Sequence, residues 1–266
     1  MTDVRTVTTH LAAEQAALDA VVADLDDSAW SRPTPSPRWT VADQIAHLAY
    51  FDRAAATAIA DPDRFTQLRD ELFANFDGGD EGVDRLTLGP GRSMTPAELL
   101  AHWREGRQLL ADAAATLDDD TRVEWYGPSM GSKSFLTARL MECWAHGQDI
   151  VDAVEADRPP SDRLRHIAQL GVITRAWSYV NRGEEPPGGE VRVRLDAPSG
   201  DEWSWGPPDA ASSVSGGAED FCLVVTQRRH VDDTTLQVEG DLARDWLERA
   251  QAFAGPATDG PRAQGS

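Results

Sequence analysis

This chain of 266 residues contains few cysteines, a single lysine and no long apolar run. Its two cysteines, Cys143 and Cys222, lie far apart and match no metal-binding spacing. We therefore expect reduced, buried thiols and a reducing compartment. No run of about 18 apolar residues occurs, which excludes a transmembrane helix. The segment that begins at Met1 lacks the basic-then-apolar pattern of a signal peptide, so we expect a cytoplasmic protein.

Positive charge is also scarce, because 25 lysine and arginine residues face 45 aspartate and glutamate residues. The formal net charge of -20 would repel a phosphate backbone or an anionic membrane, so we expect neither nucleic acid nor membrane as a partner. Lys133 is the only lysine, and alanine, aspartate and glycine are abundant. This usage indicates GC-rich coding DNA, as in many actinobacteria.

Residues 1–183 show the periodicity of a helical domain. Thr40 with Asp43, and Thr95 followed by Pro96 and Glu98, are typical helix starts. Segments rich in proline, glycine or serine predict loops at 31–37, 77–82 and 127–132. The predicted helices cover about 4–25, 40–59, 65–76, 95–117, 135–154 and 161–181.

The pattern changes after a linker rich in proline and glycine at 184–189. Residues 191–195 alternate as a strand does, and 202–205 is the expected hairpin partner. We predict a helix at 218–226 in preference to a buried strand, a short strand at 235–238 and a closing helix at 241–253. The fold class is therefore a helical domain, 1–183, followed by a small α+β domain, 184–254. The tail at 255–266 is rich in glycine, proline and alanine, and we predict that it is disordered.

A metal site is predicted from Glu142 and His146, which stand four residues apart in the apolar helix at 135–154. That spacing leaves the two side chains about 40° apart in azimuth and about 6 Å apart along the axis. A buried carboxylate and imidazole need a partner, and a metal ion supplies one. His47, on the helix at 40–59, is the best third ligand. Two histidines and one carboxylate leave coordination positions open, as catalytic sites do, and zinc is the metal we expect.

Asp149 lies three residues beyond His146, on nearly the same helix face. It could orient a ligating imidazole by accepting a hydrogen bond, or it could be an ordinary polar residue. The sequence does not distinguish these two roles of Asp149.

Three segments together resemble the mycothiol-dependent maleylpyruvate isomerase family, whose helical part belongs to the DinB/YfiT-like metalloproteins. They are Thr40-Val-Ala-Asp-Gln-Ile-Ala-His47-Leu, Glu142-Cys-Trp-Ala-His146-Gly-Gln-Asp149-Ile and Val238-Glu-Gly-Asp241-Leu-Ala. The resemblance covers nearly all of 1–254. It implies an up-down-up-down four-helix bundle in the first domain, with His47, Glu142 and His146 as metal ligands. It also implies a thiol cosubstrate, mycothiol, and an arginine of the small domain near that thiol, for which Arg228 is the closest match.

The predicted chemistry follows from a metal that can bind a thiolate. Neither cysteine is placed as a nucleophile, so we expect an external thiol. Addition of its thiolate to an activated double bond would give cis–trans isomerisation of a maleylpyruvate-like substrate, whereas a leaving group would give S-transfer. The alternatives are a metal-water hydrolase with Asp149 as general base, and a non-catalytic metal-binding protein. The expected partners are the thiol and a small electrophile, with the chain as a monomer or homodimer.

Overall fold

The computed structural model describes residues 3–75 and 79–265, and it is mostly helical with a small mixed sheet. The chain divides into two compact units, Met1–Arg158 and Pro159–Ser266. The boundary therefore lies at Arg158 and not near residue 183 as predicted. The reason is packing: α8 (Leu164–Ile173) contacts α10 (Ala218–Val225), and α9 (Arg175–Val180) contacts α11 (Asp241–Arg249), so both belong to the second unit.

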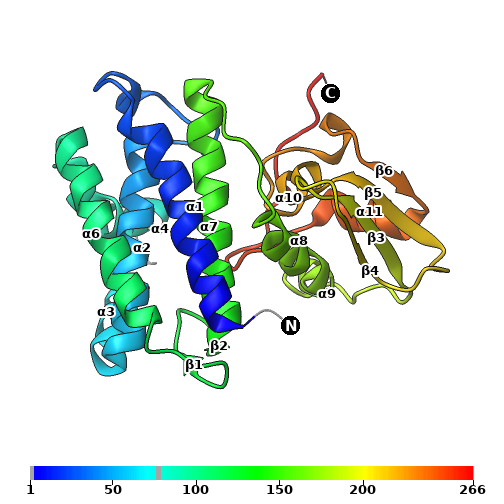
Figure 1. The fold of residues 1–266 in the computed structure, drawn as a ribbon, viewed down its shortest axis with the longest axis horizontal. Coiled ribbons are helices and arrows are strands. Elements are labelled where there is room, and N and C mark those ends of the chain that lie inside the picture. Colours follow the sequence, from blue (N-terminus) through cyan, green and yellow to red (C-terminus); the bar gives the residue numbers. More distant parts are fainter. Residues whose placement is uncertain (1–2, 76–78, 266) are drawn as a thin grey trace. The chain divides into compact units, whose positions relative to one another are not determined.

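Four long helices make up most of the first unit: α1 (Val4–Ala23), α2 (Val41–Ala60), α6 (Pro96–Ala114) and α7 (Ser132–Val154). They lie side by side in Figure 1, and α1 and α2 each contact both α6 and α7. Two helix starts agree with the sequence prediction. Thr40 and Asp43 form a capping box at the start of α2, and Thr95 and Glu98 form another at the start of α6.

The core of this unit is formed by the apolar faces of the same helices. Its buried side chains include Leu18, Ile45, Leu48, Trp103 and Ile150. These residues recur at three- and four-residue spacings in their helices, so the hydrophobic effect fixes the rotation of each helix about its axis. The polar residues on the adjacent faces are thereby placed as well.

The segments between the long helices contain more structure than the sequence predicts. Helix α3 (Pro62–Ala74) begins at a proline, three residues before the predicted start, and Asp61 caps it. Two short helices follow, α4 (Gly79–Thr87) and α5 (Gly89–Arg92), and α4 begins within the loop predicted at 77–82. Residues 76–78 lie outside the described part of the chain. A short 3-10 turn, η1 (Ala29–Ser31), precedes the loop before α2.

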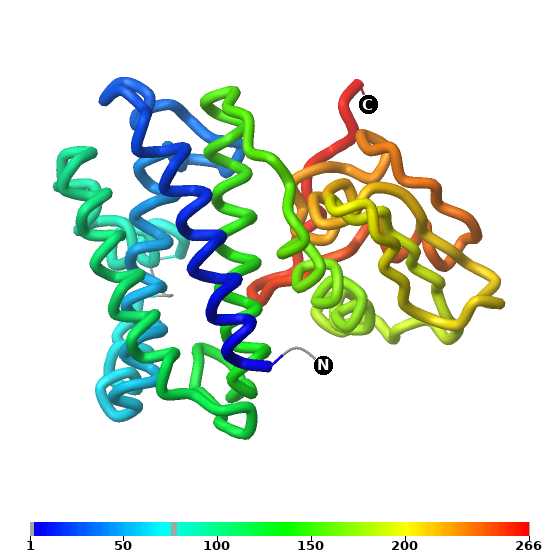
Figure 2. The backbone as a smooth tube through the Cα atoms, viewed as in Figure 1, coloured from blue at the N-terminus to red at the C-terminus, as the bar shows by residue number. Residues whose placement is uncertain are grey.

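A small hairpin precedes α7, and residues 127–129 of the loop predicted at 127–132 lie in its turn. Its strands are β1 (Arg122–Val123) and β2 (Met130–Gly131), which pair antiparallel. Figure 2 shows the chain passing from α6 through this hairpin into α7. Trp125 and Tyr126 lie between the two strands, and their rings contact Phe65 of α3.

The second unit contains a four-stranded mixed sheet in the order β4-β3-β5-β6. Its strands are β3 (Val191–Asp196), β4 (Glu202–Trp205), β5 (Ser212–Gly217) and β6 (Gln237–Glu239). The predicted hairpin is confirmed, because β3 and β4 pair antiparallel with Asp196 opposite Glu202. Strand β5 pairs parallel with β3 and antiparallel with β6. The sequence did not predict β5, since Ser212-Ser-Val-Ser-Gly-Gly217 has few residues with high strand propensity.

Helices pack on this sheet, and α10 and α11 both contact β5. The core between them includes Val193, Leu195, Val214, Phe221 and Trp246. The helix predicted at 218–226 is confirmed as α10, whereas the one predicted at 161–181 is divided into α8 and α9 around Thr174. A 3-10 turn, η3 (Val231–Asp233), precedes β6.

Residues 255–265 form neither helix nor strand, but they differ from the disordered tail predicted. The backbone N–H of Thr258 donates to Gln251 Oε1 at 3.2 Å, and Asp259 pairs with Arg182 at 2.7 Å. The backbone N–H of Gln264 donates to Asp233 at 3.0 Å. Polar groups of the second unit thus hold this segment. Across the part of the chain that is described, no helix has the length and apolar character needed to span a membrane.

Candidate metal centre

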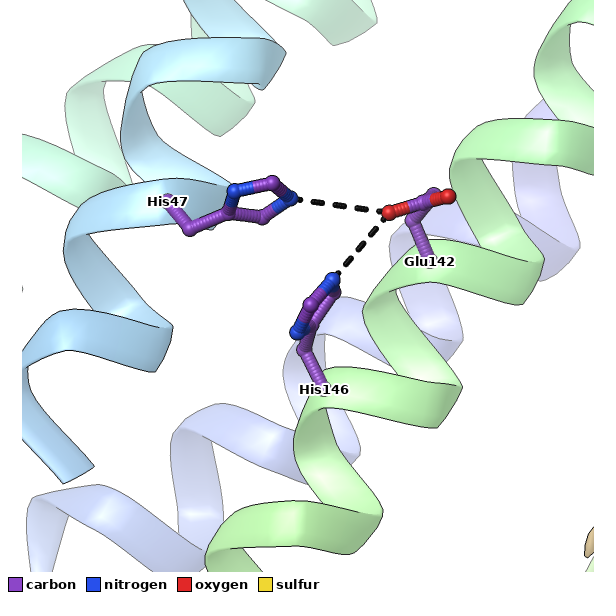
Figure 3. Close-up of side chains that lie close together, drawn as sticks. All are labelled: His47, Glu142 and His146. Carbon is purple, nitrogen blue, oxygen red and sulfur yellow. Dashed lines mark hydrogen bonds and ion pairs between the residues drawn. The ribbon is translucent and has the colours of Figure 1, made fainter. Parts of the chain in front are cut away.

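The three residues predicted as metal ligands lie together where α2 and α7 face each other. His47 comes from α2, and Glu142 and His146 come from successive turns of α7 (Figure 3). The Oε2 atom of Glu142 is 3.5 Å from His47 Nε2 and 3.2 Å from His146 Nε2. One candidate ligand atom from each residue lies within 4.8 Å of the other two. The sequence thus identified residues that converge, and ligation itself remains a prediction.

The apolar packing of α2 and α7 puts these side chains in register. Ile45 and Leu48 flank His47 in sequence, and both are fully buried in the same cluster as Cys143 and Ile150 of α7. Because helix rotation is fixed by these contacts, His47 must point toward α7 at the level of Glu142. The trio therefore needs no special loop to bring it together.

A hydrogen-bond chain fixes the orientation of the His146 ring. The Thr34 hydroxyl donates to the carbonyl of Trp39 at 2.9 Å, so it accepts from Gln44 Nε2, also at 2.9 Å. Gln44 therefore presents its Oε1 to His146 Nδ1, 2.6 Å away. Since that amide oxygen can only accept, His146 Nδ1 carries the hydrogen. The other ring nitrogen, Nε2, faces Glu142 Oε2 at 3.2 Å.

The electrostatics of the trio call for a cation. Burial, with the nearby His146 ring, lowers the pKa of His47 to about 3, so this imidazole is neutral near pH 7. Burial alone would raise the pKa of Glu142, but its contacts with His146 and His47 and the charge of Arg139 hold it well below its ordinary value. The buried Nε2 of His47 has no hydrogen-bond partner among the described residues. Two imidazole nitrogens thus converge on a carboxylate oxygen, an arrangement that a bound metal cation would stabilise.

Aromatic rings enclose the centre on two sides. Trp39 lies 5.1 Å from the His47 ring and 5.8 Å from the His146 ring, and Phe51 lies 4.5 Å from the His47 ring on the next turn of α2. The candidate ligands keep some exposure: 15% for the side chain of His47, 26% for Glu142 and 13% for His146. The site is therefore shielded but open enough for an exogenous ligand.

Asp149 lies beside His146 but is not its main partner. Its Oδ2 is 3.8 Å from His146 Nδ1, beyond hydrogen-bond distance, and it accepts from the Ser36 hydroxyl at 3.0 Å. Gln44 supplies the hydrogen bond to the imidazole instead. Sequence reasoning missed Gln44, although its position three residues before His47, on the same face of α2, is a signal that could have found it.

Arg228 belongs to the second unit and lies three residues beyond the end of α10. Its backbone N–H donates to the carbonyl of Leu223 at 2.7 Å, and its Nη1 donates to the carbonyl of Thr226 at 2.7 Å. These contacts place the arginine at the end of that helix. Its role near a thiol remains a prediction.

Known proteins resemble this chain in sequence and in fold. The family model for the mycothiol maleylpyruvate isomerase N-terminal domain matches residues 11–151, which include all three candidate ligands. Two relatives are uncharacterised proteins of Mycobacterium tuberculosis, from strains CDC 1551 / Oshkosh and H37Rv. Each is 46% identical over 247 residues, covering 92% of this chain and 94% of the relative.

Two crystal structures share the fold. One is of the mycothiol-dependent maleylpyruvate isomerase, with a TM-score of 0.57 at 19% identity. The other is of a histidine-to-alanine mutant of that enzyme, with a TM-score of 0.56 at 18% identity. Both matches cover 89% of this chain and 96% of the other.

Proposed function

Because this chain belongs to the mycothiol maleylpyruvate isomerase family, we propose that it is a metal-dependent enzyme with a low-molecular-weight thiol, mycothiol, as cosubstrate. The observation that carries the proposal is the convergence of His47, Glu142 and His146, with ligand atoms all within 4.8 Å of one another. The first unit would then be the up-down-up-down four-helix bundle of the family, with the site between its second and fourth long helices.

The donor set fits a divalent metal, and zinc is the ion we propose. Two neutral imidazoles and one carboxylate are ligands that zinc accepts, and three protein ligands leave a position for an exogenous one. A metal held there would supply Lewis acidity that stabilises a bound thiolate near neutral pH. The chain's own contribution is to orient: Gln44 holds His146 by its Nδ1 hydrogen, and Trp39 and Phe51 limit access of water.

An external thiol is favoured because the protein offers no thiolate of its own. Burial raises the pKa of both Cys143 and Cys222 well above the ordinary value, and both side chains are buried and free. Neither can act as a nucleophile near pH 7. The exposed fraction of the three candidate ligands leaves room for a thiol from solution.

The proposed reaction is thiol addition to an activated double bond. The sulfur forms a bond to one alkene carbon, and the electron pair moves onto the conjugated carbonyl oxygen. Rotation about the resulting single bond, followed by return of the electron pair and expulsion of the thiolate, gives the trans isomer of a maleylpyruvate-like substrate. If the attacked carbon carries a leaving group instead, the sulfur forms a bond to that carbon and the leaving group departs with the electron pair of the bond that breaks. The product is a thioether, and the reaction is S-transfer.

Arg228 is proposed to attract the thiol or the developing anion. Local positive charge is needed because the net charge of -20 repels anions at long range. We therefore expect the affinity for mycothiol to fall by one to two orders of magnitude in the Arg228→Ala variant, about 1.4 kcal/mol per tenfold.

The decisive experiment measures metal content and thiol binding together. Purified protein reloaded with zinc should contain one equivalent by elemental analysis, and the His146→Ala variant should contain none. Calorimetric titration with mycothiol should give binding to the loaded protein that disappears in His47→Ala. His102→Ala is the matched control, since His102 lies on α6 and contacts Arg53 instead.

Each other result has a definite meaning. Metal without thiol binding would favour the metal-water hydrolase, and binding of neither would indicate a non-catalytic protein. Thiol binding that ignored the metal would overturn the mechanism. Full metal content in all three alanine variants, at His47, Glu142 and His146, would overturn the site.

A further inference from the structure

A buried arginine with unused hydrogen-bond donors lies next to the candidate metal centre. Arg139 precedes Glu142 by three residues on α7, about 4.5 Å along the helix axis, and only 4% of its surface is exposed. Its Nε and Nη2 have no hydrogen-bond partner within residues 3–75 and 79–265. Buried guanidinium groups normally have their N–H donors paired, because an unpaired buried donor costs about 1–3 kcal/mol. These donors therefore point to a missing acceptor.

The nearest carboxylate offsets the charge of Arg139 without taking its hydrogens. Asp52 Oδ1 is 3.9 Å from Arg139 Nε, which is an ion-pair distance and too long for a hydrogen bond. Asp52 Oδ2 accepts instead from Gln15 Nε2 at 2.9 Å and from Trp103 Nε1 at 3.2 Å. Asp52 thus makes a buried cation tolerable while leaving its forked N–H groups for another acceptor.

Aromatic rings surround the guanidinium and link it to the metal centre. Its central carbon lies 5.7 Å from the Phe51 ring centroid and 5.8 Å from that of Trp125. Phe51 in turn lies 4.5 Å from His47 and 5.7 Å from Tyr126. The buried Tyr126 hydroxyl lies beside Tyr50 and makes no hydrogen bond of good geometry with a described residue. Apolar walls with a few converging polar groups are typical of a small-ligand site.

We propose that Arg139 forms a carboxylate-binding subsite adjoining the metal centre, with the Tyr126 hydroxyl as a second donor. This inference rests on the proposed function, and it places the carboxylate on the electrophilic substrate. A carboxylate matches the paired N–H groups of a guanidinium, with which it can form two parallel hydrogen bonds. The new element is the role of Arg139: it would hold the substrate carboxylate while the reactive carbon faces His47 and Glu142.

The test is calorimetric titration of the zinc-loaded protein with maleate, and with its neutral dimethyl ester. Maleate affinity should fall at least tenfold in Arg139→Gln, about 1.4 kcal/mol, and the weak response to the ester should not change. Tyr126→Phe should lower maleate affinity about threefold. Arg69→Gln is the matched control, because Arg69 carries the same charge on α3 and pairs with its neighbour Asp70. Equal maleate affinity in wild type and Arg139→Gln, or an equal loss in Arg69→Gln, would overturn the subsite.

A second variant keeps the test decisive if Arg139→Gln folds poorly. Asp52→Asn retains an oxygen that can accept from Gln15 and Trp103 but removes the negative charge facing Arg139. Maleate should then bind at least as tightly as in wild type, and weaker binding would contradict the proposal. Zinc content is measured in every variant, so failure of the metal site is read separately from failure of the carboxylate subsite.

Discussion

Two carboxylates on facing helices of the first unit have opposite properties. Glu142 on α7 contacts two imidazoles, and these contacts hold its pKa well below the ordinary value although burial alone would raise it. Asp52 on α2 is more deeply buried, and burial raises its pKa despite the nearby Arg139 and Arg107 and the hydrogen bonds from Trp103 and Gln15.

The difference teaches that neighbours decide the role of a buried carboxylate more than depth does. Groups that can themselves ligate a metal surround Glu142, so it keeps its charge for a cation. The hydrogen bonds to Asp52 come from a neutral amide and an indole, and its ion pair with Arg139 is long. Glu142 is thus suited to binding a metal cation, whereas Asp52 is suited to stabilising the buried Arg139.

The largest expected effect is the loss of stability when Asp52 is removed, which tests the difference between Asp52 and Glu142. Asp52→Ala leaves Arg139 as a buried cation and removes the acceptor of Gln15 and Trp103, so we expect a loss of about 3–5 kcal/mol in the free energy of unfolding. Urea denaturation of metal-free protein measures it.

The control for that measurement is Asp112→Ala, since Asp112 is exposed on α6 and accepts a hydrogen bond from Gln108. It should change stability by less than about 0.5 kcal/mol. A loss below 1 kcal/mol for Asp52→Ala would show that the pair with Arg139 is dispensable, contrary to the comparison.

A smaller effect concerns the surroundings of Glu142. Gln44→Ala removes the acceptor that fixes the His146 ring, so we expect zinc affinity to fall about 10- to 100-fold with the fold intact. Competition with a chromophoric chelator measures the affinity. Asp149→Asn is the matched comparison: because Asp149 is 3.8 Å from His146 Nδ1, its effect should be under about threefold. A larger loss for Asp149→Asn than for Gln44→Ala would reverse their roles.

The smallest effect is a pH dependence. A raised pKa in the folded state means that folded Asp52 binds its proton more tightly than the unfolded chain does. Its contribution to stability is therefore greatest below the ordinary value of 3.8 and is lost as pH rises through the folded pKa. The loss amounts to about 1.4 kcal/mol for each unit between the two pKa values.

The pH-dependent contribution of Asp52 is measured by denaturing metal-free wild type and the Asp52→Asn variant between pH 4 and 8. Asparagine does not titrate, so the difference between the two proteins reports Asp52 alone. The stability of the variant relative to wild type should increase with pH. A difference that stayed constant over the range would mean that Asp52 titrates normally.

The sequence predicted correctly those features that depend on residues close together in the chain. Helix starts at Thr40 and Thr95 follow from capping residues within four positions, and the spacing of Glu142 and His146 places both on one helix face. His47 could be selected because it lies on an amphipathic helix of its own. These features need no knowledge of how distant segments pack.

What the sequence did not predict depends on packing between distant segments. The partnership of Gln44 with His146 and the placement of Arg139 beside Phe51 require knowing which faces of α2 and α7 meet. The unit boundary likewise depends on the packing of α8 against α10. Strand β5 forms although its residues have low strand propensity, because it pairs with β3 on one side and β6 on the other. Residues 255–265 are held by side chains from elsewhere in the second unit, which composition alone does not reveal.

The last residue of the first unit has a practical consequence for dividing the gene into fragments. Arg158 is buried against α7, where it donates to the Trp144 carbonyl at 3.2 Å and to Gln148 at 2.9 Å, and it lies 3.6 Å from Glu14 of α1. A fragment that stops one codon earlier would lose the guanidinium that joins the first and last long helices. A fragment extended to residue 183 would instead carry the apolar faces of α8 and α9 without α10 and α11 to cover them. A stop codon directly after Arg158, or a few polar residues later, is the design that should give a soluble, metal-competent fragment.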